Sequence, residues 1–184
     1  AGEPLPKSTS DAWFAATGIR LIDGIGATEL IHIFISARGA DIRPGTTGKP
    51  LPGYQACILD ADGLPLPPGK IGRLAVKGPT GCRYLDDPRQ ASYVHQGWNV
   101  TGDLYSRDED GYFRFEARAD DMIISAGYNI AGPEVEAALL DHPAVRECAV
   151  VGVPDSDRGQ IVKAFVVLNE RYDGTPALVQ TLQQ

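Results

Sequence analysis

Two short acidic segments that end in Asp-Gly constrain the fold of this chain more than any other feature of its sequence. Asp60–Gly63 and Asp108–Gly111 each lie between two apolar segments. The paired segments are Tyr54–Leu59 with Ile71–Lys77, and Gly97–Tyr105 with Tyr112–Glu116. Asp-Gly supplies the positive φ that tight turns require, and this arrangement is typical of β-hairpins. Two successive hairpins predict a small antiparallel sheet or barrel.

The sequence changes in character after Ala117. The expected elements are, in order, a strand at Met122–Ser125, a helix from Pro133 to about Leu140, and strands at Val145–Val153 and Ile161–Leu168. This alternation is an α+β pattern, so we predict a domain boundary near Asp120 that separates residues 1–119 from residues 120–184. The tail resumes with Thr175-Pro176, a pair suited to a helix start, and is expected to stop within that helix at Gln184.

The first fifty residues give weaker signals. A short amphipathic helix is predicted over residues 8–17, where capping side chains precede apolar ones. A strand is expected at Arg20–Asp23, whereas the apolar segment Leu30–Ala37 fits a helix or a strand by its period alone. The segment Gly39–Gly53 is dense in glycine and proline and is predicted to be a loop.

Composition excludes several classes of protein. The formal net charge of −7 offers no basic surface for nucleic acid, and no apolar run reaches the length of a membrane span. The three cysteines are far apart and have neither a disulfide nor a zinc spacing, which favours a reducing cytoplasm. An export signal is not visible, and the first residue is not Met. We therefore expect a cytoplasmic protein, of which these residues are a piece.

A glycine-rich turn that ends in a hydroxyl and a carboxylate lies at Asp23–Glu29. Glycines allow the backbone to approach a ligand, the Thr28 hydroxyl can donate to a phosphate oxygen, and Glu29 can hold Mg²⁺ against that phosphate. The alternative is a plain junction in which Thr28 caps a helix and Glu29 occupies its first turn. Taken alone, the motif favours the plain junction.

Two further segments carry charged side chains with the same ambiguity. Asp103 ends a predicted strand, where it could accept two hydrogen bonds from a ribose diol or could simply cap its own turn. Arg118 to Asp121 joins an arginine to two acids and could be an ordinary interdomain linker. Neither segment decides the function by itself.

The order and spacing of these segments together resemble the adenylate-forming (AMP-binding) superfamily, which includes acyl-CoA synthetases, luciferases and peptide-synthetase adenylation domains. The resemblance spans about residues 1–168 and rests on the Thr-Glu turn, Thr101-Gly102-Asp103, Arg118-Ala119-Asp120-Asp121 and the Ile124 to Glu136 segment. Within the superfamily the benzoate- and 2-aminobenzoate-CoA ligases look most similar, because Leu30 to Phe34 follows Glu29 as it does in those enzymes.

This resemblance implies a fold and a site. The chain would hold the C-terminal part of the large AMP-binding domain, including a barrel-like sheet, and the start of a small α+β domain. Thr28 and Glu29 would be catalytic, binding the α-phosphate and Mg²⁺. The nucleotide and coenzyme A would be bound by Gly2, Glu3, Pro4, Asp23, Gly24, Ile25, Asp103, Arg118 and Gly127. The acyl group would face Gly26, His32 and Ile33, and Asp120 would be the hinge between the two domains.

Some positions depart from the superfamily pattern. Ile25 stands where an aromatic residue is frequent, and Ala117 replaces the usual glycine before the arginine. The segment Pro44–Pro50 looks like a phosphate loop, but the resemblance places that loop upstream of the Thr-Glu turn. We therefore expect the phosphate loop, like the C-terminal catalytic lysine, to lie outside these 184 residues.

The implied reaction converts a small carboxylic acid and ATP to an acyl-adenylate and pyrophosphate, after which coenzyme A gives the thioester and AMP. The acid is expected to be aromatic, such as benzoate or 2-aminobenzoate, and these residues alone are expected to be inactive. Two alternatives stay open: an adenylation domain of a peptide synthetase, and a non-catalytic nucleotide-binding fragment.

Overall fold

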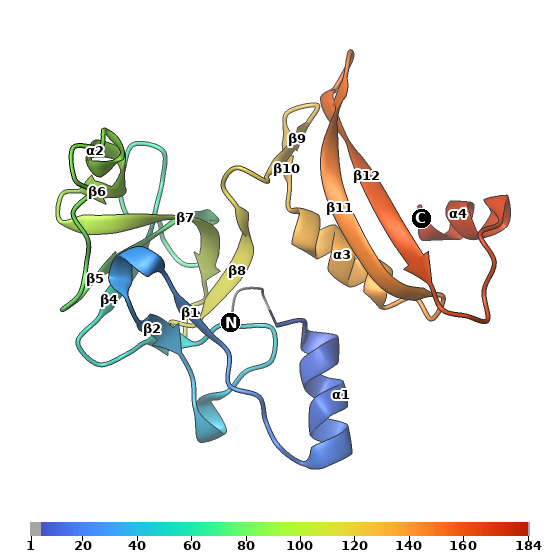
Figure 1. Ribbon diagram of the computed structural model, residues 1–184, viewed down its shortest axis with the longest axis horizontal. Coiled ribbons are helices and arrows are strands. Elements are labelled where there is room, and N and C mark those ends of the chain that lie inside the picture. Colours follow the sequence, from blue (N-terminus) through green and yellow to red (C-terminus); the bar gives the residue numbers. More distant parts are fainter. Residues whose placement is uncertain (1–4, 184) are drawn as a thin grey trace. The chain divides into compact units, whose positions relative to one another are not determined.

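The computed structural model describes residues 5–183 of the chain (Figure 1). The chain divides into two compact units, residues 1–119 and 120–184, at the boundary expected from the change in sequence pattern. Both units combine helices with antiparallel strands, so the predicted α+β class is confirmed. No helix among the described residues is long and apolar enough to cross a bilayer.

The first unit contains helices α1 (Lys7–Thr17) and α2 (Arg89–Tyr93), the 3₁₀ turns η1 (Thr28–Leu30) and η2 (Gly39–Asp41), and two sheets. One sheet has the order β1-β2-β3, with strands at Gly24–Gly26, Ile33–Ser36 and Lys49–Pro50. The other has the order β4-β5-β7-β6, with β8 paired to β7. Its strands are Gln55–Leu59, Gly72–Lys77, Val94–His95, Trp98–Arg107 and Phe113–Arg118.

Both predicted hairpins are present, as β4–β5 and β7–β8. In the first turn the Asp60 side chain accepts hydrogen bonds from the backbone N–H groups of Asp62 and Leu64, and Gly63 has φ +82°. In the second, the Asp108 carboxylate accepts from Tyr112 N, and Gly111 has φ +85°. Asp-Gly therefore fixes the connections, because aspartate binds the turn backbone and glycine tolerates positive φ.

One buried cluster joins the two sheets of the first unit. It consists of Leu30, Phe34, Ile35, Ile58, Leu74, Val76, Tyr105 and Phe113. Leu30, Phe34 and Ile35 are completely buried, so the η1 turn and strand β2 are anchored by apolar burial. This anchoring fixes the position of the residues immediately before Leu30.

Three sequence predictions in this unit need correction. The strand expected at Arg20–Asp23 is absent: β1 begins only at Gly24, where its pairing with Ser36 of β2 starts. Leu21 and Asp23 are partly buried, but they lie outside that pairing. Helix α1 begins at Lys7 with Pro6 as the N-cap, and that cap makes no side-chain hydrogen bond. The segment Gly39–Gly53, predicted to be a loop, contains η2 and the short strand β3, because Lys49 and Pro50 pair with β2. The segment Leu30–Ala37, which fitted a helix or a strand, divides between η1 and β2 at Ile31, where φ is +65°.

The second unit is a four-stranded antiparallel sheet of order β10-β9-β12-β11 with α3 packed on β11. Its elements are β9 (Ile123–Ser125), β10 (Tyr128–Ile130), α3 (Gly132–Leu140), β11 (Val145–Asp155), β12 (Gly159–Leu168) and α4 (Pro176–Leu182). These bounds agree closely with the predicted strands and helix. Thr175 caps α4 by accepting a hydrogen bond from Leu178 N, as the Thr-Pro pair indicates.

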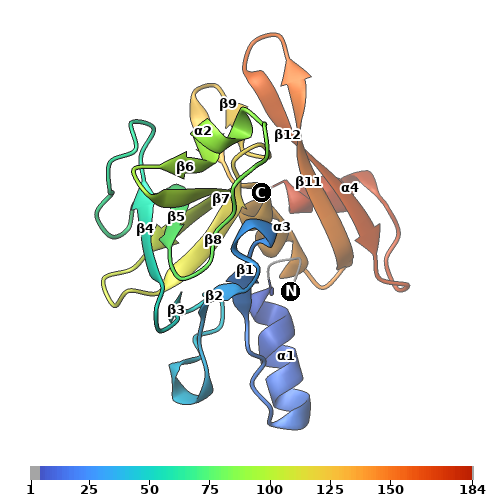
Figure 2. The same ribbon diagram turned by 60° about the vertical axis from the view of Figure 1, so that its left-hand side comes forward.

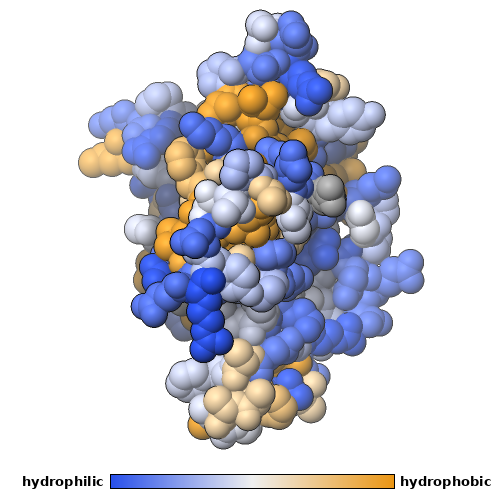
Figure 3. All heavy atoms as spheres, turned by 90° about the vertical axis from the view of Figure 1, so that its right-hand side faces the viewer, coloured by the Kyte–Doolittle hydropathy of each residue, from blue (hydrophilic) through white to orange (hydrophobic). Residues whose placement is uncertain are grey.

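The long β11–β12 hairpin carries apolar side chains on its exposed side. Val151, Phe165 and Val167 are 42–55% exposed. Figure 3 shows apolar surface bordered by hydrophilic side chains on the side of the molecule where β12 and α4 lie in Figure 1. The alternate residues Cys148 and Val150 of β11 direct their side chains toward α3: Cys148 Sγ donates to the Glu136 oxygen, and a Cβ atom on Gly132 would lie 3.9 Å from Val150 Cβ.

Candidate functional site

The Asp23–Glu29 segment forms strand β1 followed directly by the η1 turn. Gly24 and Gly26 lie opposite Ser36 and Ile33 of β2, and the pairing register shifts between Ile25 and Gly26. This irregularity turns the chain into η1, where Thr28 is exposed and Glu29 is partly exposed. Ala27 is the N-cap, so Thr28 does not cap this turn. The hydroxyl and the carboxylate therefore lie on an anchored turn at the surface of the unit.

Glu29 lies in a cluster of polar and aromatic side chains from a distant part of the chain. The Tyr84 hydroxyl donates a hydrogen bond to Glu29 Oε1 at 2.6 Å. That hydrogen bond is the largest cause of a lowered pKa for Glu29, with a smaller contribution from the positive charge of Arg89. The carboxylate is therefore ionised at neutral pH and suited to a cation or to hydrogen-bond donors.

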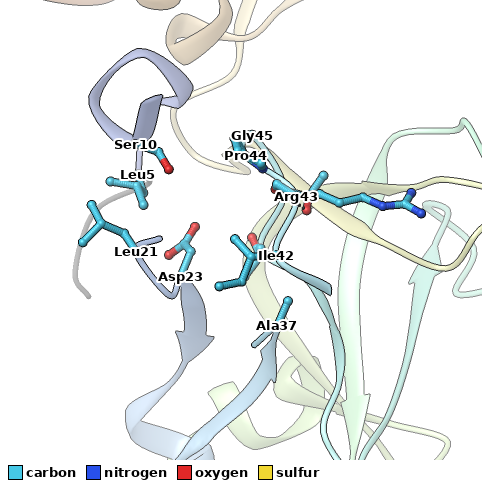
Figure 4. A pocket seen from close by; sticks show the side chains of 11 residues that line it. Leu5, Ser10, Leu21, Asp23, Ala37, Ile42, Arg43, Pro44 and Gly45 are labelled. Atoms are coloured by element: carbon cyan, nitrogen blue, oxygen red, sulfur yellow. Dashed lines mark hydrogen bonds between the residues drawn. The ribbon is translucent and has the colours of Figure 1, made fainter. Parts of the chain in front are cut away.

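Asp23 points away from this cluster. Figure 4 shows its carboxylate in a hollow between α1 and residues 42–47, beside Ser10, Leu21 and Ile42. Burial raises the pKa of Asp23, although Oδ1 accepts a hydrogen bond from Gly24 N at 2.8 Å. The structure thus separates the Asp23 side chain from the Thr28–Glu29 turn while keeping its backbone continuous with Gly24 and Ile25.

The three residues predicted to face the acyl group lie together at the start of β2. Gly26 pairs with Ile33, and a Cβ atom on Gly26 would lie 2.9 Å from the backbone oxygen of His32. His32 is exposed, and its Nδ1 lies 2.6 Å from the Ile33 oxygen. A side chain at position 26 would collide with backbone atoms, so glycine is required for this close approach.

Asp103 and Arg118 face each other across β7 and β8. They are register partners, and Arg118 Nε lies 3.7 Å from Asp103 Oδ1. Asp103 is held at the end of a short hydrogen-bonded chain: its N–H donates to Thr101 Oγ1, and that hydroxyl donates to the Leu74 oxygen. The pair gives a donor and an acceptor at one place, which suits the hydroxyl groups of a sugar.

The remaining predicted positions lie in or next to the second unit, or outside the described residues. Asp120 is the first residue of the second unit and stands in the turn after β8. Gly127 (φ +84°) and Ala126 (φ +49°) form the two-residue turn between β9 and β10. Gly2, Glu3 and Pro4 lie outside the described residues.

A metal site formed by protein side chains alone is not present in the described part of the chain, where no three His, Cys, Asp or Glu side chains are grouped to hold an ion. Mg²⁺ in nucleotide sites is usually held by one or two carboxylates together with substrate phosphates. A carboxylate has about four acceptor positions, so the hydrogen bond from Tyr84 does not exhaust Glu29. The Glu29 carboxylate therefore fits a metal ion that arrives with a phosphate ligand.

Comparison with known proteins identifies the family in which this site occurs. The model of the AMP-binding enzyme family matches residues 1–84, and the model of the AMP-binding enzyme C-terminal domain matches residues 134–184. The chain belongs to the AMP-binding enzyme family. Its membership agrees with the resemblance seen in the sequence motifs, and the two matches fall in the two compact units.

Relatives of this AMP-binding chain are acyl-CoA synthetases and CoA ligases. Mouse acyl-coenzyme A synthetase ACSM3 is 44% identical over 179 residues, which are 94% of this chain and 31% of that protein. Benzoate–CoA ligase of Thauera aromatica is 40% identical over 97% of this chain and 34% of its own length. The chain thus spans about a third of the length of these curated relatives.

A solved structure supports the same family assignment. The anthranilate CoA ligase AuaEII, in complex with anthranoyl-AMP, superimposes with a TM-score of 0.89 and 41% identity. The alignment covers 98% of this chain and 36% of that chain. The fold of these residues is therefore that of an adenylate-forming CoA ligase.

Sequence reasoning found the Thr28–Glu29 turn but missed the residues that surround Glu29. Tyr84 lies 55 positions further along the chain, in a segment for which we made no structural prediction. Tyr84 lies in the irregular segment that precedes helix α2 and strand β6, and these two elements lie against β7 (Figure 1 and Figure 2). A hydrogen bond between such distant positions leaves no local pattern in a single sequence.

Proposed function

We propose that the protein to which these residues belong is an ATP-dependent, AMP-forming carboxylate–CoA ligase. It would join a carboxylic acid to ATP to give an acyl-adenylate and pyrophosphate, and would then transfer the acyl group to the thiol of coenzyme A, releasing AMP. The observation that carries this proposal is the anchored Thr28–Glu29 turn in a chain that matches both AMP-binding models. The relatives named above include acyl-CoA synthetases and aryl-CoA ligases.

In this proposal the two residues of the η1 turn act on the phosphates of ATP. The Thr28 hydroxyl donates a hydrogen bond to an α-phosphate oxygen, and the Glu29 carboxylate holds Mg²⁺ beside that phosphate. When bound, Mg²⁺ would neutralise part of the phosphate charge. Because Leu30 is completely buried, both groups are held before the substrate arrives, and preorganised groups of this kind stabilise the transition state.

The Asp103–Arg118 pair and the backbone of residues 23–25 bind the remainder of the nucleotide. Asp103 accepts hydrogen bonds from the ribose hydroxyls, and Arg118 donates to the same sugar. The backbone of Asp23, Gly24 and Ile25 lies along the adenine, and the family resemblance assigns Gly2, Glu3 and Pro4 to the same base. Ile25 provides an aliphatic contact where relatives often have an aromatic ring.

The second unit contributes after adenylation. Asp120 is the hinge about which this unit turns between the two half-reactions, and the tight β9–β10 turn at Gly127 then approaches the pantetheine arm of coenzyme A. Positive φ at Ala126 and Gly127 keeps this turn narrow. A narrow turn with little side chain suits passage beside a thin, extended arm.

We further propose an aromatic acid, such as benzoate or 2-aminobenzoate, as the substrate. Two of the three relatives named above are aryl-CoA ligases, and the residues that the family resemblance assigns to the acyl group, Gly26, His32 and Ile33, lie together where β1 meets β2. An acyl-coenzyme A synthetase is equally similar, so aliphatic acids are the natural competitors.

The full-length protein tests both parts of this proposal. It should show acid-dependent ATP–pyrophosphate exchange and should form AMP together with an acyl-CoA. The kcat/KM for benzoate or 2-aminobenzoate should exceed that for butyrate and hexanoate. Preference for the aliphatic acids would overturn the aromatic assignment alone, whereas absence of exchange with any acid would overturn the ligase itself.

A further inference from the structure

Among the described residues, Tyr84 is the one whose side chain forms a hydrogen bond with the Glu29 carboxylate. The phenol hydroxyl lies 2.6 Å from Oε1, a short distance that is typical of a hydroxyl donating to an ionised carboxylate. A glutamate side chain has three rotatable bonds, so its carboxylate can take many orientations. The hydrogen bond from Tyr84 holds Oε1 in place and thereby fixes the direction of the other oxygen, Oε2.

Tyr84 is itself held from three sides. Its backbone N–H donates to Gln90 Oε1 at 2.8 Å. Its ring meets the edge of Tyr93 at a centroid distance of 5.6 Å, and the Arg89 guanidinium lies 4.6 Å from the ring centre. Arg89 forms an ion pair with Asp87, with 2.7 Å between Arg89 Nη2 and Asp87 Oδ2. A ring restrained in this way presents its hydroxyl at a constant position.

The charges around the ring agree with a donor role. A tyrosine hydroxyl is a hydrogen-bond donor at neutral pH, so Tyr84 can donate to the ionised carboxylate. The Tyr93 hydroxyl is buried and has no hydrogen-bond partner in the described residues. Glu29 thus meets a phenol hydroxyl, while the second carboxylate of this cluster, that of Asp87, is paired with the Arg89 guanidinium.

We propose that Tyr84 is the positioning residue for Glu29: it holds Oε1 and thereby directs the rest of the carboxylate toward the Mg²⁺ and phosphate of the bound nucleotide. This inference rests on the proposed function, because it assigns Glu29 to the metal–phosphate site. Tyr84 touches neither the metal nor the substrate and acts through Glu29 alone. Removal of the group that orients a metal ligand typically weakens metal binding about 10- to 100-fold.

The test uses Tyr84→Phe in the full-length protein, which removes the hydroxyl and keeps the ring against Tyr93 and Arg89. Tyr54→Phe is the matched control, because Tyr54 also donates or accepts one side-chain hydrogen bond, to Thr80 Oγ1 at 2.8 Å. Isothermal titration calorimetry with preformed Mn²⁺·ATP, in the absence of the acid, measures binding of the metal–nucleotide complex to the protein without turnover. Glu29→Gln and the double variant Glu29→Gln/Tyr84→Phe complete a double-mutant cycle.

We expect Tyr84→Phe to weaken Mn²⁺·ATP binding by about 10-fold or more. Tyr54→Phe should leave the affinity for Mn²⁺·ATP within about 2-fold of the parent, because Tyr54 does not orient a metal ligand. The double variant should bind no more weakly than Glu29→Gln, since the effect of Tyr84 passes through that carboxylate. Thermal melting of each variant shows that the protein remains folded.

Two results would separate the failure of this inference from the failure of the proposed function. If Glu29→Gln weakens Mn²⁺·ATP binding and Tyr84→Phe does not, the positioning role is wrong and the metal assignment stands. The positioning role would also be wrong if Tyr84→Phe weakened Mn²⁺·ATP binding by the same factor in the Glu29→Gln variant as in the parent. That result would show a role of Tyr84 that is independent of Glu29. If the parent binds no Mn²⁺·ATP, or Glu29→Gln has no effect, the metal–phosphate assignment itself fails.

Discussion

Replacement of Asp103 by alanine should reduce the free energy of AMP binding far more than it reduces the free energy of unfolding. In the proposed complex the Asp103 carboxylate accepts hydrogen bonds from the ribose. A hydrogen bond to a charged group contributes about 1.5–3 kcal/mol, so Asp103→Ala should raise the Kd for AMP about 10- to 150-fold at 25 °C.

The cost to folding is smaller. Arg118, the partner of Asp103 across the strands, is 54% exposed, and the two atoms lie 3.7 Å apart. Ion pairs with such exposure contribute about 0.2–1 kcal/mol to stability. The difference between these two magnitudes allows the ligand role and the structural role of Asp103 to be measured separately.

Isothermal titration calorimetry of AMP with the full-length protein measures the first effect, and thermal unfolding measures the second. Asp62→Ala is the control, because Asp62 is an exposed carboxylate in the β4–β5 turn of the same unit. A folded Asp103→Ala variant whose AMP affinity matches that of the control would refute the ribose assignment. Asp103 would then be a residue that orders the end of the β7–β8 pair.

Three further predictions concern the hinge, the extent of the chain and a buried acid. Asp120→Pro in the full-length protein fixes φ near −65°, so single-turnover thioester formation should fall much further than adenylation; equal loss of both would argue against a hinge. A polypeptide of these 184 residues should give no ATP–pyrophosphate exchange with benzoate, because the family resemblance requires a phosphate loop and a lysine beyond them; exchange above a blank would contradict this. Burial raises the pKa of Asp23, so its charged form opposes folding at neutral pH. Asp23→Asn should therefore raise the Tm at pH 7, by an amount that shrinks as pH falls through the raised pKa toward 3.8; a Tm difference that is constant with pH would contradict it.

The hairpins and the second unit could be predicted because their signals are local. Asp60 and Asp108 bind the backbone of their own turns, and the apolar periods of β11 and β12 lie in continuous segments. The first forty residues were harder, because their structure depends on contacts with distant segments. Ser36 donates to the oxygen of Asp23, thirteen positions away, and this contact belongs to the β1–β2 pairing that no local pattern near Asp23 indicates.

The candidate site divides in the same way. Motif order selected Thr28, Glu29, Asp103 and Arg118 as candidates, and the fold brings the last two together as register partners. The orientation of a side chain could not be predicted: Asp23 belongs to the same motif as Glu29, yet its carboxylate enters a different hollow. The contact of Tyr84 with Glu29 depends on the packing of α2 and β6 against β7, which is decided by tertiary structure.

The most direct test of the central claim is to identify the products that the full-length protein forms from ATP, benzoate and coenzyme A. The account predicts that AMP and pyrophosphate appear in step with benzoyl-CoA, or with another acyl-CoA when its acid is the better substrate, and that Glu29→Gln slows their formation. Release of ADP and phosphate in place of AMP and pyrophosphate, or acid-independent hydrolysis of ATP, would contradict it.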